Sequence, residues 1–307
     1  MKGALLVLVL TVGAAGASGQ DHPTFKASVD LVSLNVVVVD KRQQFVTGLG
    51  ADSFAVYEDG VRQDVSFFSA GELPLDLAIL LDTSRSMADK LSTAQRAAVG
   101  FVSALGPGDR LLVLDVNDTA NILAPLSSDH NAARNAILRT SANGGTALYN
   151  AVYLTLKELV RQRRADAGMR RQAVVLLSDG NDTKSLVSFD DVMELAKQSG
   201  ISVYTITLGA EDDEQGGGGW QATANRPRQG MRALAQETGA RAFSAKEADG
   251  LAGVYKTIAR ELANQYSLGY TSTNQRRDGG YRRVVVRVVD LPGLQLRTRA
   301  GYLAPRT

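Results

Sequence analysis

One apolar run that ends at a carboxylate constrains the fold of this chain more than any other stretch. Residues 77–81 are apolar without interruption, and Asp82 follows them. Such a run is typical of a strand that is buried on both faces of a parallel sheet. Ser84 and Ser86 come directly afterwards, and apolar residues then recur over 87–105 at the spacing of one helix face. The stretch therefore predicts a strand, a turn rich in oxygen atoms and a helix.

The turn after this strand offers only hard oxygen donors. A carboxylate and two hydroxyls suit Mg²⁺, Mn²⁺ or Ca²⁺ better than a soft metal or one that prefers imidazole. The same residues could instead cap the following helix, because Asp and Ser are preferred N-cap residues. The turn by itself does not decide between a metal site and a helix cap.

The composition is typical of a soluble globular protein. The chain has 307 residues, of which 44% are hydrophobic and 21% are charged. A formal net charge of +2 from 34 basic and 32 acidic residues gives no overall basic field, so we expect no nucleic-acid partner. Because the chain contains no Cys, disulfides and thiol chemistry are excluded.

The amino-terminal residues form an export signal. Residues 1–19 combine Lys2, an apolar run and small residues near the end, and we interpret them as a secretory signal peptide. This predicts an exported protein in the periplasm, on the cell surface or outside the cell. No later apolar run reaches the length of a transmembrane helix, so we expect no membrane span in the mature chain.

The middle of the chain alternates between strand patterns and helix patterns. This alternation predicts an α/β domain over residues 72–264, with a doubly wound, mostly parallel, six-stranded Rossmann-like sheet. In the expected strand order 3-2-1-4-5-6, the first strand (75–82) and the fourth (173–178) are neighbours. The strand at 120–126 follows that at 110–116 so closely that the two should pair antiparallel.

Both ends of the chain show strand patterns without helices. The apolar alternation and the Asp59-Gly60 turn predict strands at 34–39, 54–57, 61–68, 283–289 and 294–299. Neither end would make a comfortably stable sheet alone. We therefore expect a small Ig- or fibronectin-like β-sandwich from residues 24–70 and 265–305, with the α/β domain inserted between them.

Candidate functional residues follow two of the predicted strands. Ligands of a doubly wound sheet bind outside the carboxyl strand ends, where the strand order reverses. Asp82 ends the first strand and Asp179 follows the fourth. Between them in sequence, Gly144 and Gly145 permit the sharp turn that Thr146 needs to approach a shared ion.

At these residues the chain resembles the von Willebrand factor type A (VWA) domain. The metal-ion-dependent adhesion site of that family combines a D-x-S-x-S turn after the first strand, a Thr in a Gly-rich loop and an Asp in a D-G pair after the fourth strand. All five metal positions are filled here, by Asp82, Ser84, Ser86, Thr146 and Asp179. The resemblance covers roughly residues 74–264. The flanking strands are similar to a secreted bacterial subgroup of VWA-related proteins best known from Acidobacteria.

The resemblance implies a non-enzymatic binding module. Ser84, Ser86 and often Thr146 would contact a divalent cation directly, whereas Asp82 and Asp179 would act through water. Mg²⁺ is the first choice, with Mn²⁺ and Ca²⁺ as alternatives. The open coordination position would accept an Asp or Glu carboxylate from a protein partner.

Two other functions remain open from the sequence. Asp82 could be the nucleophile of a Mg²⁺-dependent phosphatase-like hydrolase, as in haloacid dehalogenase-like enzymes, although Ser84 stands where those enzymes carry a second Asp. The protein could also be an architectural spacer with a vestigial metal site. A Ser-His-Asp hydrolase is disfavoured, because His22 and His130 are isolated, lie outside the predicted site and are expected at the surface.

Arginines gather near the end of the helix expected at 146–163. They are Arg161, Arg163, Arg164, Arg170 and Arg171. We expect them to complement the negative end of that helix, with a basic docking patch as the alternative.

Overall fold

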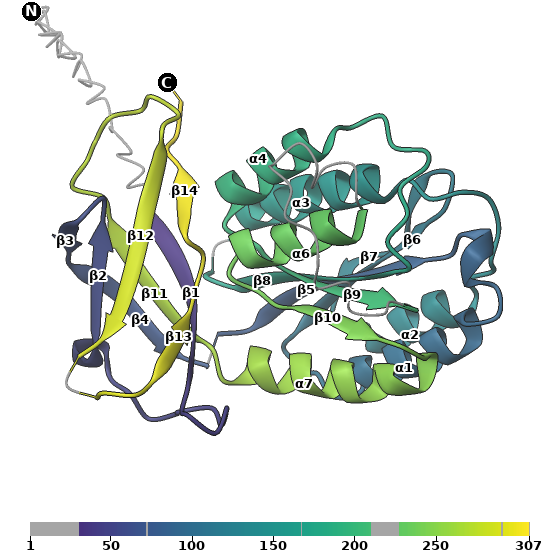
Figure 1. Cartoon of the computed structure of the whole chain (residues 1–307), viewed down its shortest axis with the longest axis horizontal. Coiled ribbons are helices and arrows are strands. Elements are labelled where there is room, and N and C mark those ends of the chain that lie inside the picture. The colour runs from purple at the N-terminus through teal and green to yellow at the C-terminus, as the bar shows by residue number, and fades with distance from the viewer. Residues whose placement is uncertain (1–30, 72, 167, 210–226, 290, 307) are drawn as a thin grey trace, which may run out of the picture. The chain divides into compact units, whose positions relative to one another are not determined.

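Figure 1 shows the computed structural model of the chain. It describes residues 31–71, 73–166, 168–209, 227–289 and 291–306. The expected signal peptide, residues 1–19, lies outside the described residues. Within the described residues, none of the helices combines the length and the apolar character that crossing a membrane requires.

A six-stranded sheet forms the centre of the α/β part, with strand order β10-β9-β8-β5-β6-β7. Its strands are β5 (Leu75–Asp82), β6 (Arg110–Val116), β7 (Ala120–Ser127), β8 (Arg171–Ser178), β9 (Ser202–Leu208) and β10 (Ala242–Ala245). Only β7 pairs antiparallel within it, with β6. The order is the predicted 3-2-1-4-5-6, so the first and fourth strands, β5 and β8, are neighbours.

Helices cover both faces of this sheet. They are α1 (Leu91–Val102), α2 (His130–Leu138), α3 (Leu148–Ala165), α4 (Phe189–Ser199), α6 (Pro227–Glu237) and α7 (Leu251–Ala263). Figure 1 shows α3, α4 and α6 on one face and α1, α2 and α7 on the other.

Successive residues of β5 point into two different cores. Ile79 packs in the cluster that includes Tyr255 of α7, whereas Leu80 packs in the cluster that includes Leu156 of α3. Every residue of β5 is therefore buried. This is why the sequence shows an uninterrupted apolar run instead of an alternation.

Two further four-stranded sheets contain strands from both ends of the described chain, in the orders β13-β1-β11-β4 and β14-β12-β2-β3. Their strands are β1 (Leu31–Val39), β2 (Phe54–Glu58), β3 (Val61–Gln63), β4 (Val65–Ala70), β11 (Tyr266–Thr271), β12 (Tyr281–Val288), β13 (Gln295–Arg297) and β14 (Gly301–Leu303). All pairings are antiparallel. One apolar cluster takes Val36 and Tyr266 from the first sheet and Val56 and Val286 from the second.

The strand predictions for the chain ends need correction in three places. The single strand expected at 61–68 is interrupted at Asp64, and its halves β3 and β4 belong to different sheets. β12 and β13 also lie in different sheets, although they are close together in the sequence. Two strands were not predicted: β11, although Tyr266, Leu268 and Tyr270 alternate there with Ser267 and Gly269, and the short β14. A strand that changes sheet keeps its local pattern, so sequence alone does not show the change.

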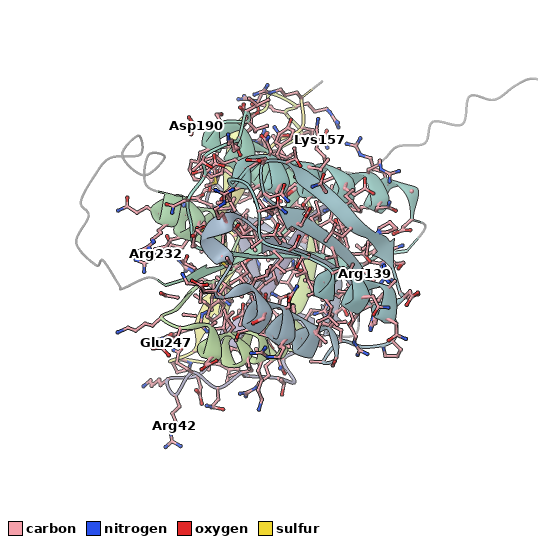
Figure 2. The ribbon with its side chains drawn as sticks, turned by 90° about the vertical axis from the view of Figure 1, so that its right-hand side faces the viewer. Arg42, Arg139, Lys157, Asp190, Arg232 and Glu247 are labelled. Atoms are coloured by element: carbon pink, nitrogen blue, oxygen red, sulfur yellow. The ribbon has the colours of Figure 1, made fainter. Side chains whose placement is uncertain are left out.

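Charged side chains of both signs lie at the periphery. Arg139, Lys157, Asp190 and Glu247 are exposed and illustrate this mixture (Figure 2). The mixture is consistent with the near balance of 34 basic and 32 acidic residues in the chain.

Candidate metal site

Asp82, the last residue of β5, has a fully buried side chain whose two oxygens are both engaged. Oδ1 accepts a hydrogen bond from the backbone N–H of Ser84 at 2.9 Å, and Oδ2 accepts one from the hydroxyl of Ser178 at 2.5 Å. Burial raises the pKa of this carboxyl, and the charge of Asp179 acts in the same direction, whereas the bonds from Ser178 and Ser84 oppose them. A cation at this site would favour the charged carboxylate.

The hydroxyls of Ser84 and Ser86 lie side by side, with 3.0 Å between their Oγ atoms. The turn that carries them is fixed by main-chain hydrogen bonds, since Thr83 N donates to Val116 O at 2.8 Å and Arg85 N donates to Gly144 O at 3.1 Å. The end of β6 and the glycine loop therefore hold the turn that carries the two hydroxyls.

This turn does not cap a helix. A 3₁₀ turn spans Arg85–Met87, and its N-cap residue Ser84 makes no side-chain capping bond. The α-helix begins only at Leu91, after Lys90, which also makes none. The helix therefore starts later than the expected residue 87, and neither Ser84 nor Lys90 caps it with a side chain.

Thr146 is held between two loops. Thr146 is 3% exposed, and its N–H donates to Thr183 Oγ1 at 3.0 Å. Its carbonyl accepts hydrogen bonds from the backbone N–H groups of Thr183 and Lys184, at 2.9 and 3.0 Å. Gly144, two residues earlier, has φ +67°. The glycine loop thus supplies the predicted turn, and Gly144 O is also the acceptor for Arg85 N.

Asp179 follows β8 and is 9% exposed. β8 is hydrogen-bonded to β5, with Leu177 opposite Leu81, so Asp179 emerges beside Asp82 at the carboxyl edge of the sheet. The Coulombic effect of Asp179 on the pKa of Asp82 reflects this proximity. Ser178 was not among the predicted site residues, although a hydroxyl at the end of a buried strand directly before Asp179 was a usable signal.

The donor set fits a hard divalent cation. It comprises two carboxylates and three hydroxyls from three separate segments, and two negative charges match a doubly charged ion. Among the residues that the structure describes, no group of three or more His, Cys, Asp or Glu side chains could hold a metal ion. A site here therefore depends on its Ser and Thr hydroxyls.

Replacing Gly144 with alanine should destabilise the protein by about 1–3 kcal/mol and weaken cation binding. The positive φ disfavours a side chain, and a Cβ atom would lie 2.6 Å from Asp118 Oδ2. Asp118 also accepts from Gly145 N at 2.8 Å, so its displacement would loosen the loop that carries Thr146. Urea unfolding and Mg²⁺ titration measure the two effects.

Gly100→Ala is the matched control for that substitution. Gly100 lies inside α1 and has open space where a Cβ would be placed, so alanine should raise helix stability by up to about 1 kcal/mol. Equal unfolding midpoints for the two variants would show that the loop does not require glycine at position 144.

The arginines near the end of α3 are largely internal supports. Arg170 pairs with Asp76 at 2.6 Å, Arg171 donates to Leu73 O at 3.0 Å, and Arg163 donates to Gln172 Oε1 at 2.8 Å. Burial lowers the pKa of Arg163 and of Arg171. These three residues therefore do not form the alternative docking patch.

His130 is half-buried, so it is less exposed than expected, and it lies outside the candidate site. Its Nε2 is 3.0 Å from the carbonyl oxygen of Asp109. His130 begins α2, away from the carboxyl strand ends. His22 lies outside the described residues.

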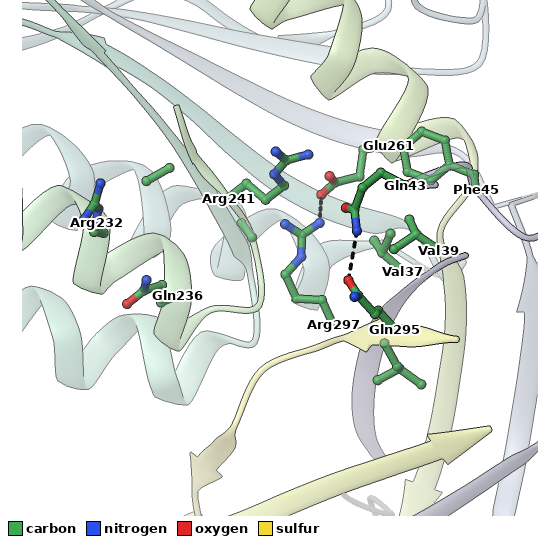
Figure 3. A pocket seen from close by; sticks show the side chains of 13 residues that line it. Val37, Val39, Gln43, Phe45, Arg232, Gln236, Arg241, Glu261, Gln295 and Arg297 are labelled. Carbon is green, nitrogen blue, oxygen red and sulfur yellow. Dashed lines mark hydrogen bonds and ion pairs between the residues drawn. The ribbon is translucent and has the colours of Figure 1, made fainter. Parts of the chain in front are cut away.

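A cavity of about 520 Å³ lies away from these donors. Its lining includes Arg241, just before β10, and Glu261 near the end of α7, which places it toward the amino ends of the parallel strands. Figure 3 shows the ion pair between Glu261 and Arg297 of β13 inside it. Glu261 also accepts from Tyr204 Oη at 2.7 Å, so the carboxylate is part of a buried structural network.

The fold and the position of the oxygen donors define a Rossmann-like α/β domain with a polar cluster at the carboxyl edge of its sheet. The profile of the von Willebrand factor type A domain matches residues 76–257, more than half of the chain. The chain therefore belongs to the VWA family.

Curated relatives are distant. A UPF0353 protein of Mycolicibacterium paratuberculosis is 26% identical over 199 residues, which are 61% of this chain and 60% of the relative. A UPF0353 protein of Nocardia farcinica is 23% identical over 219 residues, 65% of each chain. The chain thus spans less than two thirds of the length of these relatives.

Solved structures confirm the fold. A von Willebrand factor type A protein from Catenulispora acidiphila has a TM-score of 0.52 and 14% identity, covering 84% of this chain and 76% of that chain. Proximal thread matrix protein 1 from the mussel byssus has a TM-score of 0.50 and 14% identity, covering 64% and 49%. At these identities the likeness supports the fold alone.

Proposed function

We propose that this protein is a non-enzymatic module that binds a protein partner through a divalent cation. The observation that carries the proposal is the pair of hydroxyls of Ser84 and Ser86, 3.0 Å apart beside the buried carboxylate of Asp82. Main-chain bonds join their turn to the loop that carries Thr146. VWA domains commonly bind proteins, and the arrangement matches that role.

The five side chains would bind the cation in two ways, directly or through water. Ser84, Ser86 and Thr146 would offer hydroxyl oxygens directly, and Asp82 and Asp179 would act through water and balance the charge. When bound, the cation supplies an electrophilic centre for an Asp or Glu carboxylate of the partner. Mg²⁺ remains the first choice, with Mn²⁺ and Ca²⁺ as alternatives.

The hydrolase alternative finds less support at Asp82. Ser84 occupies the position where an acid would have to protonate the leaving group. Turnover of an aryl phosphate that disappears in Asp82→Asn would favour the enzyme instead.

We also propose a location and a domain organisation. The signal pattern at residues 1–19 supports export, to the periplasm, the cell surface or the medium, as in the secreted subgroup best known from Acidobacteria. Residues 24–70 and 265–305 would form an Ig- or fibronectin-like sandwich around the VWA domain at 72–264. The mixed origin of the strands in both four-stranded sheets supports this division.

Titration calorimetry with Mg²⁺, Mn²⁺ and Ca²⁺ tests the metal site. We expect saturable binding to the wild-type protein, with a dissociation constant on the order of 10⁻⁴–10⁻³ M, and none to Asp179→Ala, because one of the two charges that balance the ion is lost. Asp249→Ala removes an exposed carboxylate elsewhere in the domain and should bind normally. Equal binding by wild type and Asp179→Ala, or none by either at millimolar ion, would contradict the proposal and favour a spacer with a vestigial site.

A further inference from the structure

Leu186 lies seven residues after Asp179 in the chain and has a side chain that is 95% exposed. The next most exposed large apolar side chain among the described residues is Val61, at 56%. A single exposed leucine is ordinary on a protein surface. Leu186 differs because its backbone is firmly anchored.

The side chain of Asn150 in α3 fixes the backbone at this leucine. Asn150 Oδ1 accepts hydrogen bonds from the N–H groups of Leu186 and Val187, both at 3.0 Å. In return, the N–H of Asn150 donates to Ser185 Oγ at 3.0 Å. These reciprocal bonds hold the loop against the first turn of the helix.

The same loop is also bonded to the segment that carries Thr146. Thr183 and Lys184 donate to Thr146 O, and the N–H of Leu148 donates to Asp182 Oδ1 at 2.9 Å. Residues 146–150 and 182–187 therefore form one continuous hydrogen-bonded unit. Leu186 is held in a fixed position relative to a residue of the candidate metal site.

A fixed, exposed apolar side chain is well suited to binding. The loop is already ordered, so a partner that covers Leu186 loses little conformational entropy and gains the burial of apolar surface. Two exposed cationic residues belong to the segments of the candidate site: Lys184 in the same loop as Leu186, and Arg85 between the two serines. The surroundings of the site therefore combine an apolar contact with positive charge.

We propose that the partner segment carries an Asp or Glu and, close to it, an apolar side chain that packs on Leu186. The inference rests on the proposed function, because the carboxylate would bind the cation. It adds a second requirement, since an acidic residue alone would not be enough for full affinity. Leu186 would then be a determinant of partner specificity.

A displayed library of random short peptides tests this pairing. Peptides are selected on wild-type protein in Mg²⁺ and eluted with EDTA, and their affinities are measured by fluorescence polarisation. We expect an acidic residue with an apolar residue at a recurring offset. Leu186→Ser should weaken binding about tenfold, the effect of losing one buried leucine contact.

Matched variants separate the possible outcomes. In Leu186→Ser, replacing the apolar residue of the peptide with serine should have no further effect, whereas in wild type it should weaken binding. Leu138→Ser removes an exposed leucine of α2 and should change nothing. If replacing the apolar residue of the peptide weakens binding equally in wild type and in Leu186→Ser, the inference is overturned. EDTA-sensitive binding by the wild type would still support the proposed function in that case. If wild type yields no EDTA-sensitive peptides, the proposed function fails, and the inference fails with it.

Discussion

Replacing Asp76 with alanine is expected to lower the free energy of unfolding by about 3–5 kcal/mol. Asp76 is fully buried near the start of β5 and pairs with Arg110 and Arg170, at 2.6 Å in each case. The pKa of Arg110 is raised, first by its hydrogen bond to Asp76 and then by that to Asp166. In the alanine variant, the guanidinium groups of Arg110 and Arg170 would both lose the buried carboxylate with which they pair.

Urea unfolding followed by circular dichroism measures this loss. Asp76→Asn keeps the shape of the side chain and should separate the effect of charge from that of packing. Arg161→Ala breaks the exposed ion pair with Glu158 and should leave the midpoint unchanged. If Asp76→Ala lowers the free energy of unfolding by less than about 1 kcal/mol, these ion pairs contribute no more than exposed surface pairs do.

Replacing Glu58 with alanine should destabilise the two four-stranded sheets by about 3–5 kcal/mol. Glu58 of β2 is 2% exposed and accepts hydrogen bonds from Tyr270 Oη of β11 at 2.8 Å, Tyr302 Oη of β14 at 3.0 Å and Ser272 Oγ at 2.6 Å. Burial raises the pKa of Tyr302 to about 12, with Glu58 acting in the same direction. The carboxylate therefore joins both sheets, and its loss leaves buried hydroxyls without an acceptor.

Thermal and urea unfolding of Glu58→Ala give the size of the effect, and limited proteolysis shows which part opens. Glu58→Gln keeps one carbonyl acceptor and should fall between alanine and wild type. Asp64→Ala, at an exposed acidic residue of the same region, serves as the control. We expect the sheets to be cleaved first while residues 72–264 resist. An unfolding curve for Glu58→Ala that overlays that of Asp64→Ala would show that the buried carboxylate does not hold the sheets together.

The central sheet could be predicted from sequence because its signals are local and strong. The apolar run before Asp82 is buried on both faces of the sheet. Strands and amphipathic helices alternate along this part of the chain, and that order indicates parallel pairing of the strands. The two outer sheets were harder to predict. β11 lies in the middle of its sheet, between β1 and β4, and the alternation of Tyr266, Leu268 and Tyr270 with smaller residues was a usable signal that was overlooked. The interruption at Asp64 depends on contacts that no short window contains.

The sequence alone determined which residues stand at the carboxyl ends of neighbouring strands. Asp82 and Asp179 are placed by strand length and strand order, both of which follow from hydrophobic periodicity. Only the tertiary structure decided three features of the site. Ser178 donates to Asp82, the Ser84 turn is fixed by the end of β6 and the glycine loop instead of capping a helix, and Asn150 anchors Leu186. These contacts join residues far apart in the chain through a few hydrogen bonds each, which leave no periodic pattern in the sequence.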